Sequence, residues 1–378
     1  MKKIFVFLIV FCILLLTGCG KNTSESVFKD LTKKINNLNT YTLSGVLEVK
    51  NDNSNYNYDV VVDFKKDDKY KVSLRNISNS HEQVILRNDE GVYVITPSLN
   101  KSFKFQSDWP YNNSQIYILN SIINDLNNDS EIIKEKKDDK YVFISKVKYP
   151  NNNNLVKQRV IVNEDLAIEK IEILNNEDNV EMIFTINKID YNPTFDETYF
   201  EVNNIINTNT NNLEIDKNNN METNQDSNMT GNNKACPENE NCDSDVNKTT
   251  SSMNGTENIT PTATLQDIIY PLHLPTGTVL EDQEKISKTD GERVILTFAG
   301  EKNFTLVEET VLKEEDFTVI PTYGEPGFIN DTVGALTDNS LNWISDGIEY
   351  YIVSDVMSTV ELLDIANSIN VSAVASLK

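Results

Sequence analysis

The side chains best able to do chemistry are few and scattered along this chain of 378 residues. Its two histidines, His81 and His273, fall in different parts of the sequence, which leaves little scope for a zinc enzyme or a histidine-based triad. The sequence also has no Gly-x-Ser-x-Gly elbow, no His-Glu-x-x-His motif and no phosphate-binding Gly-x-x-x-x-Gly-Lys-Ser/Thr loop. It therefore predicts a non-enzymatic protein without catalytic residues, metal or cofactor.

The charge balance excludes another class of function. The chain has 58 acidic and 34 basic side chains, for a net charge of -24. A nucleic-acid-binding protein needs a basic stripe, so nucleic acid is not an expected partner. Acidic pairs such as Asp67 and Asp68 are so frequent that their spacing indicates only a solvated surface.

The first nineteen residues have the features of an export signal. Lys2 and Lys3 precede an uninterrupted apolar run from Ile4 to Leu16, which is too short to span a bilayer as a helix. The following Leu-Thr-Gly-Cys sequence, ending at Cys19, resembles the lipobox of bacterial lipoproteins. The resemblance implies that residues 1–18 are a signal peptide and that Cys19 carries a diacylglyceryl anchor. Two acyl chains would hold the mature chain stably at the extracytoplasmic face of the cell membrane.

Two further cysteines, Cys236 and Cys242, lie close together in the sequence. In an exported chain such a pair can form a disulfide. The loop it would close is so short that it adds almost nothing to fold stability. A small structural loop, a redox sensor and two free thiols all remain open alternatives.

A long asparagine-rich segment divides the rest of the chain. No aromatic residue occurs between Glu201 and Ile269. Such a segment cannot bury enough apolar surface to offset its backbone entropy. We therefore expect residues 203–261 to be a disordered linker between a domain at 19–202 and a smaller one at 262–378. A chain of this length would let the second domain range over about 40 Å.

The sequence of the first domain predicts a helix followed by many strands. A helix capped by Ser24 would place Phe28, Leu31, Ile35 and Leu38 on one stripe. Apolar residues then alternate with polar ones, which predicts about ten antiparallel strands and a second helix near 114–126. We expect an α+β fold in which a strongly curved open sheet wraps round the helices. The outer face would be in water, and the interior would be either filled core or a cavity for an acyl chain.

The second domain reads as a small α+β unit. Strands are expected at 293–299, 303–309, 333–337, 341–345 and 349–353. Ser358 and Glu361 have the spacing of a capping box, and Val360, Leu363, Ala366 and Ile369 would form the apolar helix face. The closing run, with its Leu-Asn-Trp and Gly-Ile-Glu-Tyr-Tyr segments, resembles the DUF4367 domain.

The lipobox, first helix, antiparallel meander, helical insert and closing hairpins together resemble Gram-positive members of the LolA/LolB superfamily. These include sporulation and germination lipoproteins such as GerS. The resemblance implies a half-barrel that binds an envelope protein, for example a cortex hydrolase during spore envelope assembly or germination. Two alternatives follow from the same superfamily: a carrier or acceptor of a lipid or lipoprotein acyl chain, and an RseB-like regulator that binds an anti-sigma factor.

Overall fold

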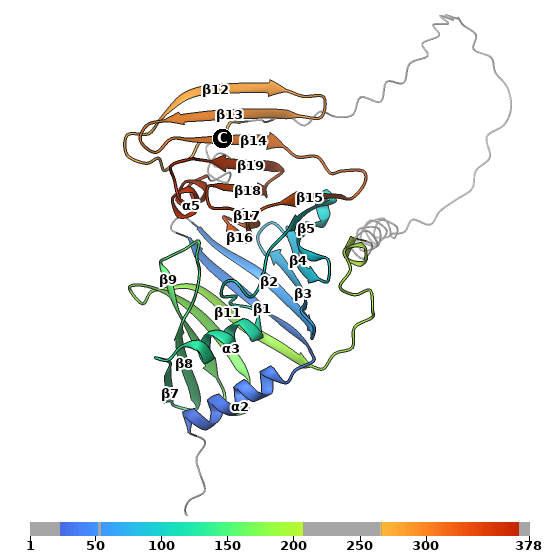
Figure 1. Ribbon diagram of the computed structural model, residues 1–378, viewed down its shortest axis with the longest axis vertical. Coiled ribbons are helices and arrows are strands. Elements are labelled where there is room, and N and C mark those ends of the chain that lie inside the picture. The colour runs from blue at the N-terminus through green and yellow to red at the C-terminus, as the bar shows by residue number, and fades with distance from the viewer. Residues whose placement is uncertain (1–22, 52–53, 207–264, 266, 370–378) are drawn as a thin grey trace, which may run out of the picture.

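The computed structural model describes residues 23–51, 54–206, 265 and 267–369, which form two β-sheets with few helices (Figure 1). This confirms the predicted α+β class, with a large open sheet and a second, smaller sheet. Cys19, Cys236 and Cys242 lie outside the described residues, as does nearly all of the predicted linker. The anchor, the disulfide and the linker therefore stay predictions.

The larger sheet has twelve strands in the order β15-β6-β5-β4-β3-β2-β1-β11-β10-β9-β8-β7. All neighbouring strands are antiparallel except β15 and β6, which run parallel. The strands are β1 (Thr40–Asn51), β2 (Ser54–Lys65), β3 (Lys69–Asn76), β4 (Glu82–Asn88), β5 (Gly91–Thr96), β6 (Lys101–Phe105), β7 (Ile133–Lys137), β8 (Lys140–Lys146), β9 (Leu155–Val162), β10 (Ile168–Asn175), β11 (Val180–Tyr191) and β15 (Thr318–Thr322).

Two helices, α2 (Ser24–Asn36) and α3 (Leu119–Asn128), pack against β7 and β8 and cover the inner face of this sheet (Figure 1). Phe28, Leu31 and Ile35 are buried, which confirms the predicted stripe. The cap is Thr23 rather than Ser24, because its Oγ1 accepts from the Ser26 N–H at 3.1 Å.

The second helix starts later than the predicted 114–126. The backbone N–H of Ser114 donates to the Lys148 carbonyl, and that of Gln115 donates to the Ser121 hydroxyl. These bonds hold the residues before Leu119 in an irregular turn. The apolar side chains there are buried nevertheless, including Ile116.

The outer face of the sheet is not wholly in water, and this part of the prediction is wrong. Over β4 and β5, residues 195–206 fold back across the outer face and bury it. The covered cluster consists of Val84, Leu86, Tyr93, Ile95, Phe200 and Ile205. Because both faces of β4 and β5 are buried here, each strand has a run of consecutive apolar residues, at 84–86 and 92–95, instead of strict alternation.

The smaller sheet has seven strands in the order β12-β13-β14-β19-β18-β17-β16. They are β12 (Val279–Ser287), β13 (Glu292–Ala299), β14 (Phe304–Thr310), β16 (Glu325–Ile329), β17 (Thr332–Leu336), β18 (Ser340–Ser345) and β19 (Ile348–Val353). The five predicted strands are present, each within about one residue of its predicted ends.

Helix α5 (Thr359–Asn367) packs on this sheet, and its capping box between Ser358 and Glu361 is confirmed. The predicted apolar face is partly wrong. Leu362 and Ile365 are fully buried with Ala366 and Ile369, whereas Val360 and Leu363 are only half-buried. Across the described ranges, no helix is both long and apolar enough to cross a membrane.

Candidate interaction site at the junction of the two sheets

A strand from the C-terminal region joins the larger sheet. β15 belongs to the C-terminal region by sequence but pairs in parallel with β6, from Thr318 opposite Lys101 to Thr322 opposite Phe105. The chain before β15 is also fixed, because the Glu314 N–H donates to the Leu99 carbonyl at 3.1 Å. The C-terminal region therefore supplies one edge of the larger sheet.

Gln83 on β4 makes the second connection, and its amide is buried with 5% of the residue exposed. Its Oε1 accepts from the Val333 N–H at 2.6 Å and from the Thr332 hydroxyl at 2.9 Å. Its Nε2 donates to the Val333 carbonyl at 3.0 Å. One side chain thus bonds both backbone groups of Val333, as a neighbouring strand would.

Apolar side chains make the junction continuous. The ring of Phe328 on β16 packs on Tyr58 of β2, with ring centroids 5.6 Å apart. Val333, Ala335 and Ile344 are buried in the same cluster as the core of the larger sheet. This packing contradicts the expectation of a freely ranging second domain, and Figure 1 shows β16 and β17 against the rim of the larger sheet.

Charged groups gather at the edge of this junction. The Asp331 carboxylate accepts from Asn79 Nδ2 at 3.2 Å and from Ser345 Oγ at 2.8 Å, so it is bonded to both sheets. Asp346, in the turn between β18 and β19, is exposed. Although the residue is exposed, partial desolvation of its carboxyl group and the charge of Asp331 raise the pKa of Asp346, and the neighbouring His81 partly offsets the shift. We call Asp331 and Asp346 the junction acid pair.

The two histidines lie in different settings. Burial lowers the pKa of His81, and the carboxylates of Asp331 and Asp346 oppose that shift. His273 lies in the segment before β12, where its backbone N–H donates to Ser368 Oγ at 3.0 Å. The structure thus brings His81, but not His273, to the junction. Among the described residues, no group of three or more His, Cys, Asp or Glu side chains could hold a metal ion.

A buried carboxyl group fastens the segment that enters the smaller sheet. Glu308 on β14 is fully buried, and its carboxylate oxygens each lie 3.2 Å from the Ile269 backbone nitrogen, whose N–H they accept. Burial raises the pKa of Glu308 to about 7, although the Ile269 hydrogen bond opposes the shift. The group therefore titrates near neutral pH.

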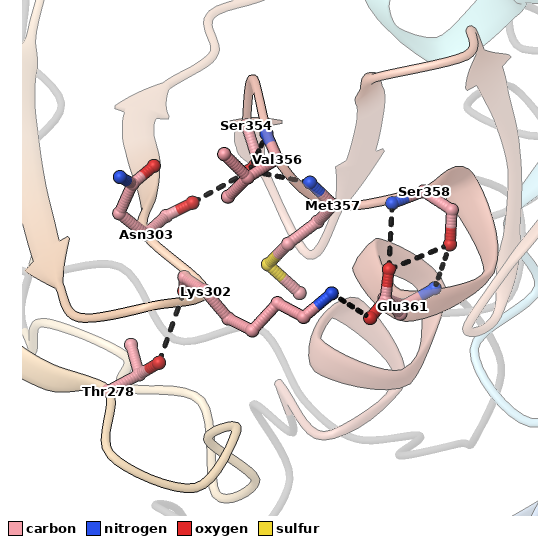
Figure 2. Close-up of polar contacts among 8 residues, drawn as sticks. All are labelled: Thr278, Lys302, Asn303, Ser354, Val356, Met357, Ser358 and Glu361. Atoms are coloured by element: carbon pink, nitrogen blue, oxygen red, sulfur yellow. Dashed lines mark hydrogen bonds and ion pairs between the residues drawn. The ribbon is translucent and has the colours of Figure 1, made fainter.

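A polar cluster fixes the start of α5, as Figure 2 shows. Lys302 Nζ lies 2.7 Å from the Glu361 carboxylate, whose other oxygen accepts from the Ser358 N–H and hydroxyl. Ser354 Oγ donates to the Asn303 carbonyl at 2.7 Å and accepts from two backbone N–H groups. The hydrogen bonds from Lys302 and Ser358 lower the pKa of Glu361 to about 2.

Among the junction residues, the sequence draws attention to His81 but not to Gln83, Asp331 or Asp346. Gln83 is a polar residue just before the apolar run of its strand. The alternating pattern predicts that its side chain faces outwards. Asp331 and Asp346 stand in short turns, beside Asn330 and Gly347, where aspartate is an ordinary turn residue. Asp331 and Asp346 lie in the turns of two separate hairpins, and no local sequence pattern links them.

Comparison with known sequences shows extended similarity to sporulation proteins. A family model described as "Sporulation protein YdcC-like" matches residues 1–200. The chain is 31% identical over 370 residues to "Sporulation protein YdcC" of Bacillus subtilis (strain 168), with 97% of each chain covered.

Among solved structures the similarity is weak. The complex of Pseudomonas aeruginosa MucA and MucB matches 90% of this chain and 98% of the other, with a TM-score of 0.28 and 11% identity. The LolA-superfamily protein NE2245 of Nitrosomonas europaea covers 47% of this chain and 97% of its own, at TM-score 0.28 and 12% identity. The complex of the CwlD amidase with the GerS lipoprotein of Clostridioides difficile covers 47% and 97%, at TM-score 0.18 and 19% identity.

Proposed function

Because the chain belongs to the YdcC-like sporulation protein family, we propose that it is a non-catalytic protein that binds another protein in the envelope of the sporulating cell. The observation that carries this proposal is the 31% identity to the Bacillus subtilis protein, which spans 97% of both chains. The similarity therefore takes in both sheets and the junction between them.

The roles of three polar side chains at the junction and in the smaller sheet support binding rather than catalysis. Gln83 bonds the backbone of Val333, and Glu308 accepts from the backbone of Ile269. Glu361 forms an ion pair with Lys302 and accepts from the Ser358 N–H at the start of α5. Each of these side chains bonds another element of the same chain. Such bonds make the protein rigid, as expected of a preformed binding surface for a partner.

The place of action follows from the lipobox-like sequence. With Cys19 acylated, the domain that begins at Thr23 would sit close to the membrane, because four extended residues reach at most about 14 Å. This position favours a partner at the extracytoplasmic face of the cell membrane. From the sequence resemblance to germination lipoproteins, the partner class we propose is a cortex peptidoglycan hydrolase, which the protein would stabilise or activate.

The test is a crosslinked pull-down of the tagged full chain from membranes of sporulating cells, followed by mass spectrometry for protein and lipid. We expect a peptidoglycan hydrolase as the enriched partner. The Cys19→Ala variant is the matched control, and we expect it to leave the membrane fraction and lose the partner. Enrichment of a lipid alone, or of an anti-sigma factor, would contradict the proposal and favour a carrier or a signal regulator.

A further inference from the structure

We infer that the free edge of β12 binds an extended, basic segment of the partner protein, which adds one strand to the smaller sheet. The inference rests on the proposed protein-binding function and names the contact surface and its chemistry. It is carried by the length and exposure of this edge, by the pattern of its side chains, and by its position in the molecule.

The first observation is that β12 is an open edge. It is the outermost strand of the smaller sheet, and eight of its nine residues are exposed. Along its outer side, the backbone groups therefore have no neighbouring strand among the described residues. A row of unpaired N–H and carbonyl groups is a template on which an extended chain can add as a further strand.

The other three sheet edges in the described ranges carry features that block such pairing. β7, β15 and β16 have five residues each, compared with nine in β12. Proline, which removes a backbone donor, lies in β15 as Pro321 and in β16 as Pro326, and β7 has three lysines. β12 has no proline, and after a bulge near Glu281 its register with β13 is regular from Asp282 to Ser287. β12 is thus the edge best suited to accept another strand.

The second observation is the pattern of side chains along this edge. Alternation places Asp282, Glu284 and Ile286 on one face of the sheet. Neither acid forms an ion pair within the described residues, whereas Lys285 Nζ, on the other face, lies 2.9 Å from Glu292 Oε2. An added strand would therefore meet two unpaired carboxylates and then an apolar side chain at alternate positions.

These charges disfavour a second copy of the chain as the occupant. In a two-fold antiparallel pair centred on Gln283, Asp282 of each copy lies opposite Glu284 of the other. Moving the centre by one residue sets Asp282 or Glu284 opposite itself, and Lys285 is already paired. Like charges directly opposite each other destabilise a strand pair, whereas opposite charges stabilise it. The edge therefore selects a segment with lysine or arginine at alternate positions.

The third observation is the position of the edge. Figure 1 shows β12 at the opposite end of the molecule from α2, close to which the described chain begins. With Cys19 acylated, α2 would lie next to the membrane, and β12 would face away from it. The acids of the edge would also repel an anionic lipid surface. A protein segment, rather than a lipid, is therefore the ligand that fits this edge.

The test uses the peptide acetyl-Thr-Val-Thr-Lys-Thr-Lys-Thr-amide. In antiparallel pairing its valine lies opposite Ile286 and its two lysines lie opposite Glu284 and Asp282. Hydrogen exchange of the full chain is measured by mass spectrometry at increasing concentrations of this peptide. We expect a saturable slowing of amide exchange in β12 and no change in β7. Unchanged exchange in β12, or equal slowing in β7, would overturn the inference.

Two control peptides separate strand pairing from charge. The first replaces both lysines by glutamate and should give no protection, because it sets like charges opposite each other. The second keeps every side chain but is N-methylated at its fifth and sixth residues. Adjacent backbone amides point to opposite sides of a strand, so one of the two methyl groups blocks a bond to β12. We expect binding at least tenfold weaker, and equal protection would mean that charge alone attracts the probe.

A charge exchange on the protein completes the design. For the Asp282→Lys/Glu284→Lys variant, we expect the lysine peptide to bind at least tenfold more weakly and the glutamate peptide to bind in its place. Glu48→Lys/Asp190→Lys makes the same charge change at exposed positions on the interior strands β1 and β11. This matched control should bind the lysine peptide as the unaltered chain does. A first variant that does not take up the glutamate peptide would contradict the proposed pairing.

Other occupants of the edge give distinct results in the absence of any peptide. If a second copy fills the edge, exchange in β12 slows as the protein concentration rises. If residues 207–264 of the same chain fill it, exchange in β12 is slow at every concentration and becomes fast when they are deleted. Either result would overturn the inference.

The cellular arm separates this inference from the proposed function. In the pull-down, we expect the Asp282→Lys/Glu284→Lys variant to stay in the membrane fraction but lose the hydrolase, while the Glu48→Lys/Asp190→Lys variant keeps it. If the first variant keeps the hydrolase, the β12 contact is wrong and the proposed function stands. If the unaltered chain binds the peptide but captures no hydrolase, the proposed function fails and the β12 edge stands as a binding surface.

Discussion

Glu308 couples the stability of the smaller sheet to pH. Its pKa is about 7 in the fold, above its ordinary value of 4.5, so the folded chain holds the proton more tightly. The contribution to stability is full below pH 4.5 and is lost as pH rises through 7. We expect this group to lower the free energy of unfolding by about 3 kcal/mol between pH 4.5 and pH 8.

Glu308→Gln removes that titration, and its unfolding free energy in urea should be flatter across this pH range. Glu309→Gln is the neighbouring control. Hydrogen bonds from Lys288 and Arg293 outweigh burial and lower the pKa of Glu309, so its loss should weaken the fold at neutral pH instead. An unaltered pH dependence in Glu308→Gln would show that this carboxyl group is not the source.

Gln83 is the residue on which the junction depends most directly. Gln83→Ala leaves the buried N–H and carbonyl of Val333 without partners, which we expect to cost about 1–3 kcal/mol. Urea unfolding measures the loss, and amide exchange at Val333 locates it. Gln106→Ala, at an exposed position just after β6, should change stability by less than about 0.5 kcal/mol. Equal effects from both substitutions would argue against a special role for Gln83.

At the scale of elements, the cap at the start of α5 makes its own contribution to the free energy of unfolding. Ser358→Ala removes the hydroxyl that accepts from the Glu361 N–H, and we expect a loss of about 1 kcal/mol. Thermal unfolding measures it, with Ser287→Ala at the exposed end of β12 as the control.

The pKa of Glu361 lies below its ordinary 4.5, so the stability that it contributes should be present above pH 4.5 and decline towards pH 2.

A second prediction at this scale concerns β15. Ile320 packs against the core of the larger sheet, while Val319 beside it is 39% exposed. Ile320→Ala should therefore loosen β15 and speed amide exchange in both β15 and β6. Val319→Ala should change exchange little. The reverse order of effects would mean that the strand is held by its backbone pairing alone.

The strands that were predicted and those that were missed differ in position. Each missed strand, β7, β12, β15 and β16, lies at the edge of a sheet. An edge strand is partly solvated and carries charges or proline, as in the Lys-rich β7 and in β15 with Pro321, so the apolar alternation is weak or absent. Interior strands and the α5 cap keep their local signals and could be predicted.

The junction could not be predicted for a different reason. Gln83 and Val333 are about 250 residues apart in the chain. No local pattern records which turn will meet which strand at such a separation. Local motifs therefore cannot reveal this candidate site, because it is assembled from single residues in ordinary turns and strands.

At the scale of the whole molecule, the junction should hold the two regions together without a continuous chain. We propose inserting a specific protease site between residues 215 and 225, outside the loop that a disulfide between Cys236 and Cys242 would close, and cutting there. The fragments should elute together in size-exclusion chromatography, and Gln83→Ala combined with Ile320→Asp should separate them. Separation of the fragments from the unaltered protein would contradict the buried junction, and the uncut chain is the control for elution.

The parallel pairing of β15 with β6 has a consequence for the order of events during synthesis. The ribosome releases the chain from its amino end, so β6 is made about two hundred residues before its neighbour. Until then the backbone groups on one edge of β6 are open to any extended chain nearby. Contacts of such long sequence separation also form late in folding. The newly made protein would thus pass through a period in which this edge can pair with other chains, and that period ends only when its own carboxyl-terminal third completes the sheet.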